Sequence, residues 1–111
     1  MRCRAAALLS LVVLAGCATS LTLPVDGSVQ GTGEWFQGSA TGYADGSGHL
    51  QVSSNTGVTC YGNFVYLTRR SGRGVFRCSD GRSGPFTFVS TGTSGLGSGS
   101  LGNDIFTFTF G

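Results

Sequence analysis

Large apolar residues alternate with polar ones from residue 31 onward, and glycine interrupts nearly every stretch of ten residues. The clearest run is Phe106, Phe108 and Phe110, which alternate with threonines. Successive side chains of a strand point to opposite faces, whereas a helix needs apolar residues three and four apart, and no window has that spacing. We therefore expect an all-β domain of six to eight short antiparallel strands in consecutive hairpins, with no substantial helix. The 20 glycines and 12 aromatic residues fit short strands joined by tight turns.

The N-terminus reads MRCRAAALLSLVVLAGC: two arginines, an apolar run, then Leu14-Ala15-Gly16-Cys17. This is the layout of a secretory signal, and its apolar run is too short for a stable membrane span. The last four residues resemble the lipobox of bacterial lipoproteins; the alternative is an ordinary signal with an unrelated cysteine. The resemblance implies cleavage before Cys17, which then carries diacylglycerol on sulfur and a third acyl chain, such as palmitate, on nitrogen. Two or three chains hold a protein firmly in a membrane.

The chain is thereby divided into three parts. Residues 1–16 are the expected signal peptide, 17–30 the lipidated cysteine and a flexible tether, and 31–111 the all-β domain. Thirteen flexible residues would hold the domain on the order of 20 Å from the bilayer. Ala18 stands where a retention signal would have aspartate, so in a cell with two membranes we expect the outer one, at its periplasmic face or at the cell surface.

Cys60 and Cys78 fall on the same alternate positions as the aromatic residues of their expected strands. Cys60 lies on the same strand face as Phe64, and Cys78 on the same face as Phe76. The turn expected at residues 68–72 lies midway between them, so the two cysteines can face each other across a hairpin. In an oxidising compartment such a pair forms a disulfide. The sequence therefore predicts a Cys60–Cys78 bond on a buried aromatic face.

Glycine-containing elements recur along the chain. Gly-x-Gly, followed two residues later by a large apolar residue, begins at Gly46, Gly72 and Gly97. Gly-x-Phe or Gly-x-Ala begins at Gly38, Gly62 and Gly84. The spacing gives about three units of roughly 24 residues, each the length of a hairpin and a connection.

These units resemble the MORN repeat, a short β-hairpin with Gly-x-Gly-x-apolar, Asp/Asn-Gly and Tyr-x-Gly-x-Phe elements. The stretch GRGVFRCSDGRSGPF, residues 72–86, has Asp80-Gly81 where that family has its turn. Cys60 departs from the usual tyrosine, this second unit is two residues short, and the third unit lacks the last element. The resemblance implies a twisted sheet and binding to membranes or proteins. A small barrel is the alternative architecture.

The expected mature chain has no net charge. Arg2 and Arg4 leave with the signal, and the five remaining cationic residues balance five acidic ones. This argues against a nucleic-acid partner. The five arginines nevertheless gather in one short stretch with a single aspartate: Arg69, Arg70, Arg73, Arg77 and Arg82.

Guanidinium groups suit phosphates and carboxylates. We therefore expect an arginine-rich hairpin that binds an anionic envelope partner, either a lipid, a polysaccharide or a protein; the alternative is a solvated hairpin tip. Trp35 is a second candidate contact, which either stacks on a sugar or closes the end of the sheet.

No residue pattern marks a catalytic centre. His49 is the sole histidine, and no Gly-x-Ser-x-Gly element is present. The run GSGSLG, residues 97–102, is followed by a strand pattern, so it is no phosphate-binding loop. A metal site of His49 with Cys60 and Cys78 would need reduced thiols. We expect no enzyme, no cofactor and no metal.

Together these features predict a lipid-anchored cell-envelope protein that acts as a non-catalytic binding or scaffolding module. The alternative is a purely structural lipoprotein that joins a partner protein by its sheet edge or aromatic face. A small hydrolase or an enzyme inhibitor is a remote alternative without supporting residues.

Overall fold

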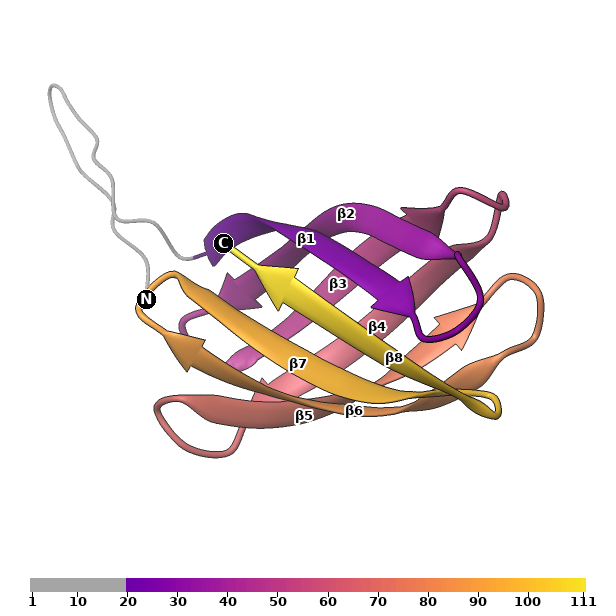
Figure 1. The fold of residues 1–111 in the computed structure, drawn as a ribbon. Helices are drawn as coiled ribbons and strands as arrows, with labels where there is room; N and C mark the ends of the chain where they lie inside the picture. The colour runs from indigo at the N-terminus through magenta and orange to yellow at the C-terminus, as the bar shows by residue number, and fades with distance from the viewer. Residues whose placement is uncertain (1–19) are drawn as a thin grey trace, which may run out of the picture.

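The computed structural model describes residues 20–111, which form eight antiparallel strands closed into a barrel (Figure 1). The strands are β1 (Ser20–Val29), β2 (Trp35–Tyr43), β3 (Ser47–Ser54), β4 (Thr59–Tyr66), β5 (Ser71–Cys78), β6 (Ser83–Thr91), β7 (Ser94–Leu101) and β8 (Asp104–Phe110). Each strand pairs with the next, and β1 pairs with β8. The all-β prediction is confirmed, and of the two expected architectures the small barrel is the one that forms. Within the described part, no helix is long and apolar enough to cross a membrane.

Phenylalanines fill the interior, and most of them face an inward glycine on a neighbouring strand. An eight-stranded barrel is just wide enough for its side chains, so a ring on one strand needs a small residue opposite. The cross-strand pairs are Gly48 with Phe64, Gly72 with Phe88, Gly74 with Phe86, Gly95 with Phe110, Gly97 with Phe108 and Gly99 with Phe106. In all but the last pair, a Cβ on the glycine would collide with the facing ring. The recurring glycines therefore make room for the aromatic core.

Residues 20–29 form β1, so the prediction of a flexible tether is wrong for these residues, and the barrel begins before residue 31. β1 pairs with β2 over its length from Ser20 to Ser28, and with β8 from Val25 onward. Leu21, Leu23 and Val25 occupy every second position of β1, as the apolar residues of the other strands do. Only two residues therefore separate Cys17 from the barrel, and Cys17 itself lies outside the described residues, as does the expected signal 1–16.

Pro24 is tolerated in β1 because it sits where the pairing with β8 stops. Its carbonyl oxygen accepts a hydrogen bond of 3.0 Å from the Gly111 amide, just beyond the end of β8. The nitrogen of Pro24 points to the same side of β1 as this carbonyl oxygen. The β1–β8 ladder does not extend to Pro24, so the missing N–H group of proline costs no ladder hydrogen bond.

The two ends of the barrel differ. One end, here the open end, carries the start of β1 and the β2–β3, β4–β5 and β6–β7 turns (left in Figure 1). The opposite, closed end carries the β1–β2, β3–β4, β5–β6 and β7–β8 turns. The buried apolar core and the disulfide lie within residues 20–111, so this part is a complete folding unit that can be studied alone.

Candidate functional site

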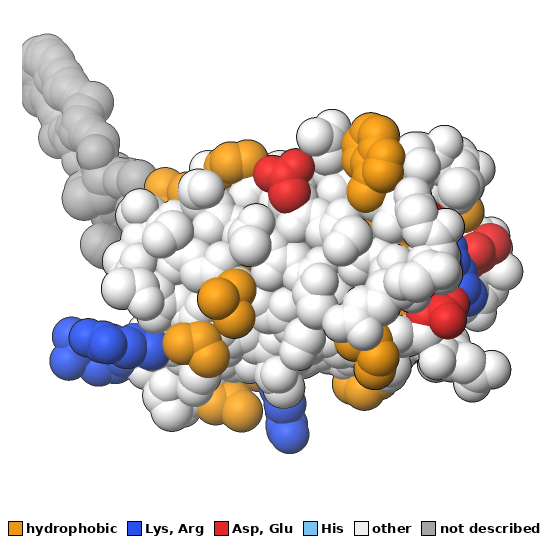
Figure 2. Space-filling view, in the orientation of Figure 1, with side chains coloured by type: hydrophobic (Ala, Val, Ile, Leu, Met, Phe, Trp, Pro, Cys, Tyr) orange, Lys and Arg blue, Asp and Glu red, His pale blue; other side chains and the backbone are white. Residues whose placement is uncertain are grey.

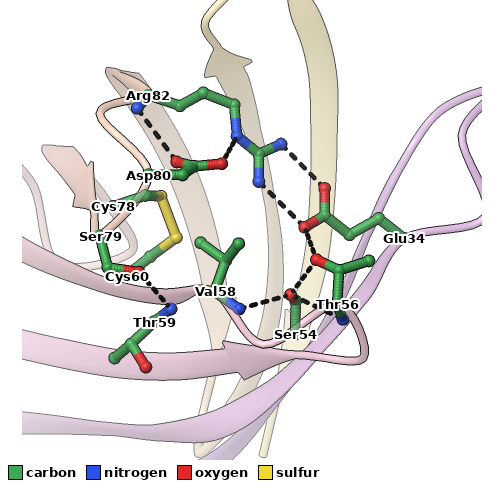
Figure 3. The surroundings of a disulfide bond; sticks show 10 residues. All are labelled: Glu34, Ser54, Thr56, Val58, Thr59, Cys60, Cys78, Ser79, Asp80 and Arg82. Atoms are coloured by element: carbon green, nitrogen blue, oxygen red, sulfur yellow. Dashed lines mark hydrogen bonds and ion pairs between the residues drawn. A yellow bond between two sulfur atoms is a disulfide. The ribbon is translucent and has the colours of Figure 1, made fainter.

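The predicted disulfide is present at the closed end. Cys60 on β4 and Cys78 on β5 are directly paired, with a Cα–Cα distance of 3.9 Å and an S–S bond of 2.00 Å (Figure 3). Cys60 is 1 % exposed and packs with the aromatic core. The bond therefore ties two neighbouring strands together on their inward face.

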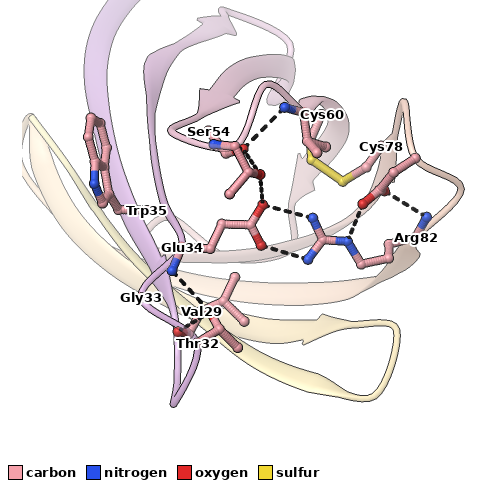
Figure 4. Close-up of polar contacts among 12 residues, drawn as sticks. Val29, Thr32, Gly33, Glu34, Trp35, Ser54, Cys60, Cys78 and Arg82 are labelled. Carbon is pink, nitrogen blue, oxygen red and sulfur yellow. Dashed lines mark hydrogen bonds and ion pairs between the residues drawn. A yellow bond between two sulfur atoms is a disulfide. The ribbon is translucent and has the colours of Figure 1, made fainter.

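An ion pair lies beside the disulfide. Arg82 donates from Nη1 and Nη2 to the two carboxylate oxygens of Glu34, at 2.8 and 2.9 Å (Figure 4). The same guanidinium donates from Nε to Asp80 at 2.7 Å, and the Thr56 hydroxyl donates to Glu34 at 2.9 Å. Glu34 is only 8 % exposed, and such bidentate pairs are the stronger kind of charged hydrogen bond. Arg82 thus joins the β5–β6 turn to the β1–β2 turn.

The hydrogen bonds from Arg82 hold the pKa of Glu34 below its usual value of 4.5, against the opposing effect of burial. The same pair raises the pKa of Arg82. Beneath the pair, the side chains of Phe36, Leu101 and Phe106 are 1 % exposed, so this end is filled. The closed end is therefore a structural plug and offers no room for a ligand.

Arg82→Ala is expected to lower the free energy of unfolding by about 2 kcal/mol near neutral pH, because it leaves a buried carboxylate without its partner. A lowered folded-state pKa contributes stability that is complete above the unfolded-state value and is lost as the pH falls through the folded-state pKa. The variant should therefore lose less stability than the parent on acidification. Urea denaturation at about pH 7 and about pH 3 measures both effects.

Arg77→Ala is the matched control, since Arg77 is exposed on β5 and has no ion-pair partner among residues 20–111. We expect this control to change stability by less than about 0.5 kcal/mol. Equal losses from the two substitutions would contradict the role of the plug.

The open end contains a half-open pocket of about 370 Å³. Seven aromatic side chains line it, from β2, β4, β6 and β8: Tyr43, Phe64, Tyr66, Phe86, Phe88, Phe108 and Phe110. Apart from Tyr43 at its end, β2 contributes only small residues to the wall, Ala40 and Gly42. A Cβ built on Gly42 meets no atom within 4 Å, so the barrel is unfilled at this point.

One strand that lines the pocket leaves part of its edge unpaired. Residues 20–24 of β1 pair with β2 but have no partner in β8, because the β1–β8 ladder begins only at Val25. Leu21, Leu23 and Gly92 of the β6–β7 turn line the pocket beside this unpaired stretch. Its volume is in the lower part of the range of small-molecule sites, which runs from about 300 to 1,000 Å³.

A polar chain links the pocket wall to the β4–β5 turn. The Tyr66 hydroxyl donates to Ser90 Oγ at 3.2 Å, and Ser90 Oγ donates to the Arg70 carbonyl at 3.3 Å. The Ser90 amide donates to the same carbonyl at 2.6 Å. The backbone of Arg70 is therefore fixed directly beside the pocket.

The structure does not gather the five arginines into one patch. Arg69 and Arg70 lie exposed in the β4–β5 turn at the open end, and Arg73 and Arg77 point outward from β5. Arg82 lies at the closed end in its ion pair. Only the first two are near the pocket.

Trp35 begins β2 at the closed end and is 48 % exposed. Its ring points away from the Glu34–Arg82 pair (Figure 4). It therefore does not close the barrel, and its surface remains available for contact.

Sequence reasoning missed the pocket. The only signal was the small pair Ala40 and Gly42 at inward positions where other strands carry rings, and this becomes visible only once the strand pairing is known. No group of three or more potential metal ligands is assembled within residues 20–111. Comparisons of the chain with protein-family models, with curated proteins and with solved structures found no match.

Proposed function

We propose that this protein is a non-catalytic binding module of the cell envelope, anchored by lipid at Cys17, whose site is the open-end pocket. The observation that carries the proposal is a half-open cavity of about 370 Å³ at the open end of the barrel, lined largely by aromatic side chains. Empty space in a protein interior forfeits dispersion contacts, so an apolar occupant would regain them. The outer membrane is the proposed location in a cell with two membranes.

Binding of decan-1-ol to residues 20–111 tests this function. At roughly 30 Å³ for each water-sized group, the pocket has room for about twelve such groups, close to the size of this uncharged probe. We expect saturable one-to-one binding by isothermal titration calorimetry. Gly42→Leu should weaken it by at least about tenfold, since a Cβ at this position meets no atom within 4 Å and the rest of the side chain would take up space in the pocket.

Ser39→Leu is the matched control, because Ser39 lies on the same strand at an exposed position and does not line the pocket. It should bind decan-1-ol like the parent. Absence of saturable binding to the parent, or equal binding to the parent and Gly42→Leu, would contradict the proposed site.

Scaffolding through the sheet edge is the second candidate. It is favoured by the start of β1, where residues 20–24 have no strand on the β8 side. Such an edge can pair with an extended segment of a partner protein. In that case the loss of the pocket through Gly42→Leu would leave partner binding intact.

A further inference from the structure

We propose that the open-end pocket takes one acyl chain of an anionic membrane lipid, that Arg69 and Arg70 bind its headgroup, and that the open end rests on the membrane surface. This inference rests on the proposed function and deepens it by naming the class of ligand. It is carried by the charge of the two ends, the rigidity of the β4–β5 turn and the apolar rim of the pocket.

The two ends of the barrel have opposite charge. The turns of the open end carry Arg69 and Arg70 against Asp45, a net charge of +1. The turns of the closed end carry Glu34 and Asp80 against Arg82, a net charge of −1. Figure 2 shows the largest group of cationic side chains at the left end and most of the anionic ones at the right end, where a cationic side chain lies among them. An anionic surface therefore attracts the open end and repels the closed end.

The β4–β5 turn is built to hold its shape. Thr68 Oγ1 accepts hydrogen bonds from the amides of Arg70 and Ser71, at 3.1 and 2.9 Å. Ser90 fixes the Arg70 carbonyl beside the pocket wall. Neither Arg69 nor Arg70 has an ion-pair partner among residues 20–111, so both guanidinium groups are free for an anion at the mouth. A turn ordered in advance loses little entropy when it binds.

Exposed apolar side chains surround the same mouth. Leu21 on β1 is 51 % exposed, Leu67 in the β4–β5 turn is 60 % exposed, and Tyr43 at the end of β2 is similarly exposed. Apolar residues next to arginines are the composition of a surface that lies in the headgroup region of an anionic bilayer.

The proposed lipid anchor at Cys17 would be attached at the open end of the barrel, where β1 begins. Cys17 precedes β1 by three residues, and each residue spans at most about 3.6 Å. The lipid on Cys17 would therefore enter the bilayer within about 11 Å of the pocket. The edge of β1 that has no β8 partner lies beside the pocket and would then offer a route by which a chain can enter from the membrane.

Three ten-carbon probes test the headgroup assignment: decanoate, decan-1-ol and decyltrimethylammonium, titrated into residues 20–111 by calorimetry. We expect decanoate to bind about tenfold more tightly than the alcohol, and the cation to bind most weakly. The double variant Arg69→Gln, Arg70→Gln should lose this preference while keeping the affinity for decan-1-ol. The matched control, Arg73→Gln with Arg77→Gln, removes the same charge from the outer wall and should behave like the parent.

The outcomes separate this inference from the proposed function. Equal affinity for all three probes, or equal loss in both double variants, would overturn the headgroup assignment and leave the pocket as an apolar site. Failure of every probe to bind would overturn both.

Vesicles distinguish a membrane lipid from a free carboxylate as the source of the chain. Residues 20–111 should co-sediment with phosphatidylglycerol vesicles and not with phosphatidylcholine vesicles, and the Arg69→Gln, Arg70→Gln variant should not co-sediment with either. Decanoate binding without selective sedimentation of the parent would overturn the membrane assignment.

Discussion

Replacing Gly84 by valine is expected to destabilise the barrel by about 3 kcal/mol or more, at or beyond the upper end for overpacked cores. A Cβ at Gly84 would collide with the main-chain carbonyl of Ser100, whose carbon lies 2.7 Å from the Cβ position. Because the obstacle is backbone, no change of rotamer can relieve it, and β6 and β7 would have to move apart. Urea denaturation of residues 20–111, followed by circular dichroism, measures the loss.

Gly42→Leu provides the internal control for this prediction. Gly42 is also a strand glycine on the inward side, but its Cβ would meet no atom within 4 Å. We expect a change within about 0.5 kcal/mol. If both substitutions destabilise the protein equally, the loss of stability at Gly84 comes from replacing any glycine in a strand and not from the close approach of β7 at this position.

The sequence alone could predict the strands of the second half of the chain and the disulfide. Phe106, Phe108 and Phe110 show the alternation without interruption, and the parity of Cys60 and Cys78 places both sulfurs on the aromatic face. These predictions succeed because they depend on neighbours along one strand or across one hairpin.

The sequence did not predict β1, and the reason is local. Pro24 and the pair Asp26-Gly27 are typical of turns, and they outweighed the alternation of Leu21, Leu23 and Val25. Pro24 fits only because the β8 ladder ends beside it, and the end of that ladder depends on how far β8 reaches after the barrel has closed.

The arginines show how linear proximity misleads in a barrel. An eight-residue strand at roughly 3.3 Å per residue carries the chain about 25 Å from one end to the other. β5 therefore separates Arg70 at the open end from Arg82 at the closed end, although their numbers differ by only twelve. The partner of Arg82 is Glu34, which is 48 residues away in the sequence, and no local sequence pattern predicts such a pair.

In the proposed function, the two ends of the barrel have different roles. The closed end holds the disulfide, the ion pair and the best-filled part of the core, whereas the open end has small residues on β2 and an unpaired start of β1. Stability should therefore depend mostly on the closed end, and binding on the open end.

Removal of the disulfide tests this division directly. In the double variant Cys60→Ala, Cys78→Ala, we expect the free energy of unfolding to fall by about 3 kcal/mol, because the bond closes a loop with a sequence separation of 18. In a domain of this size, that loss should lower the melting temperature on the order of 15 °C. Thermal and urea unfolding of the oxidised parent, the reduced parent and the variant measure it.

The reduced parent serves as the control for the substitution itself, since it loses the bond and keeps both sulfur atoms. It should match the variant to within about 1 kcal/mol, the difference being the small volume lost with the sulfurs. A variant as stable as the oxidised parent would contradict the stapling role. Below the melting transition, the variant should still bind decan-1-ol with the parent's affinity, because the pocket lies at the opposite end of the barrel. A parallel fall in affinity would instead mean that the closed end sets the shape of the open one.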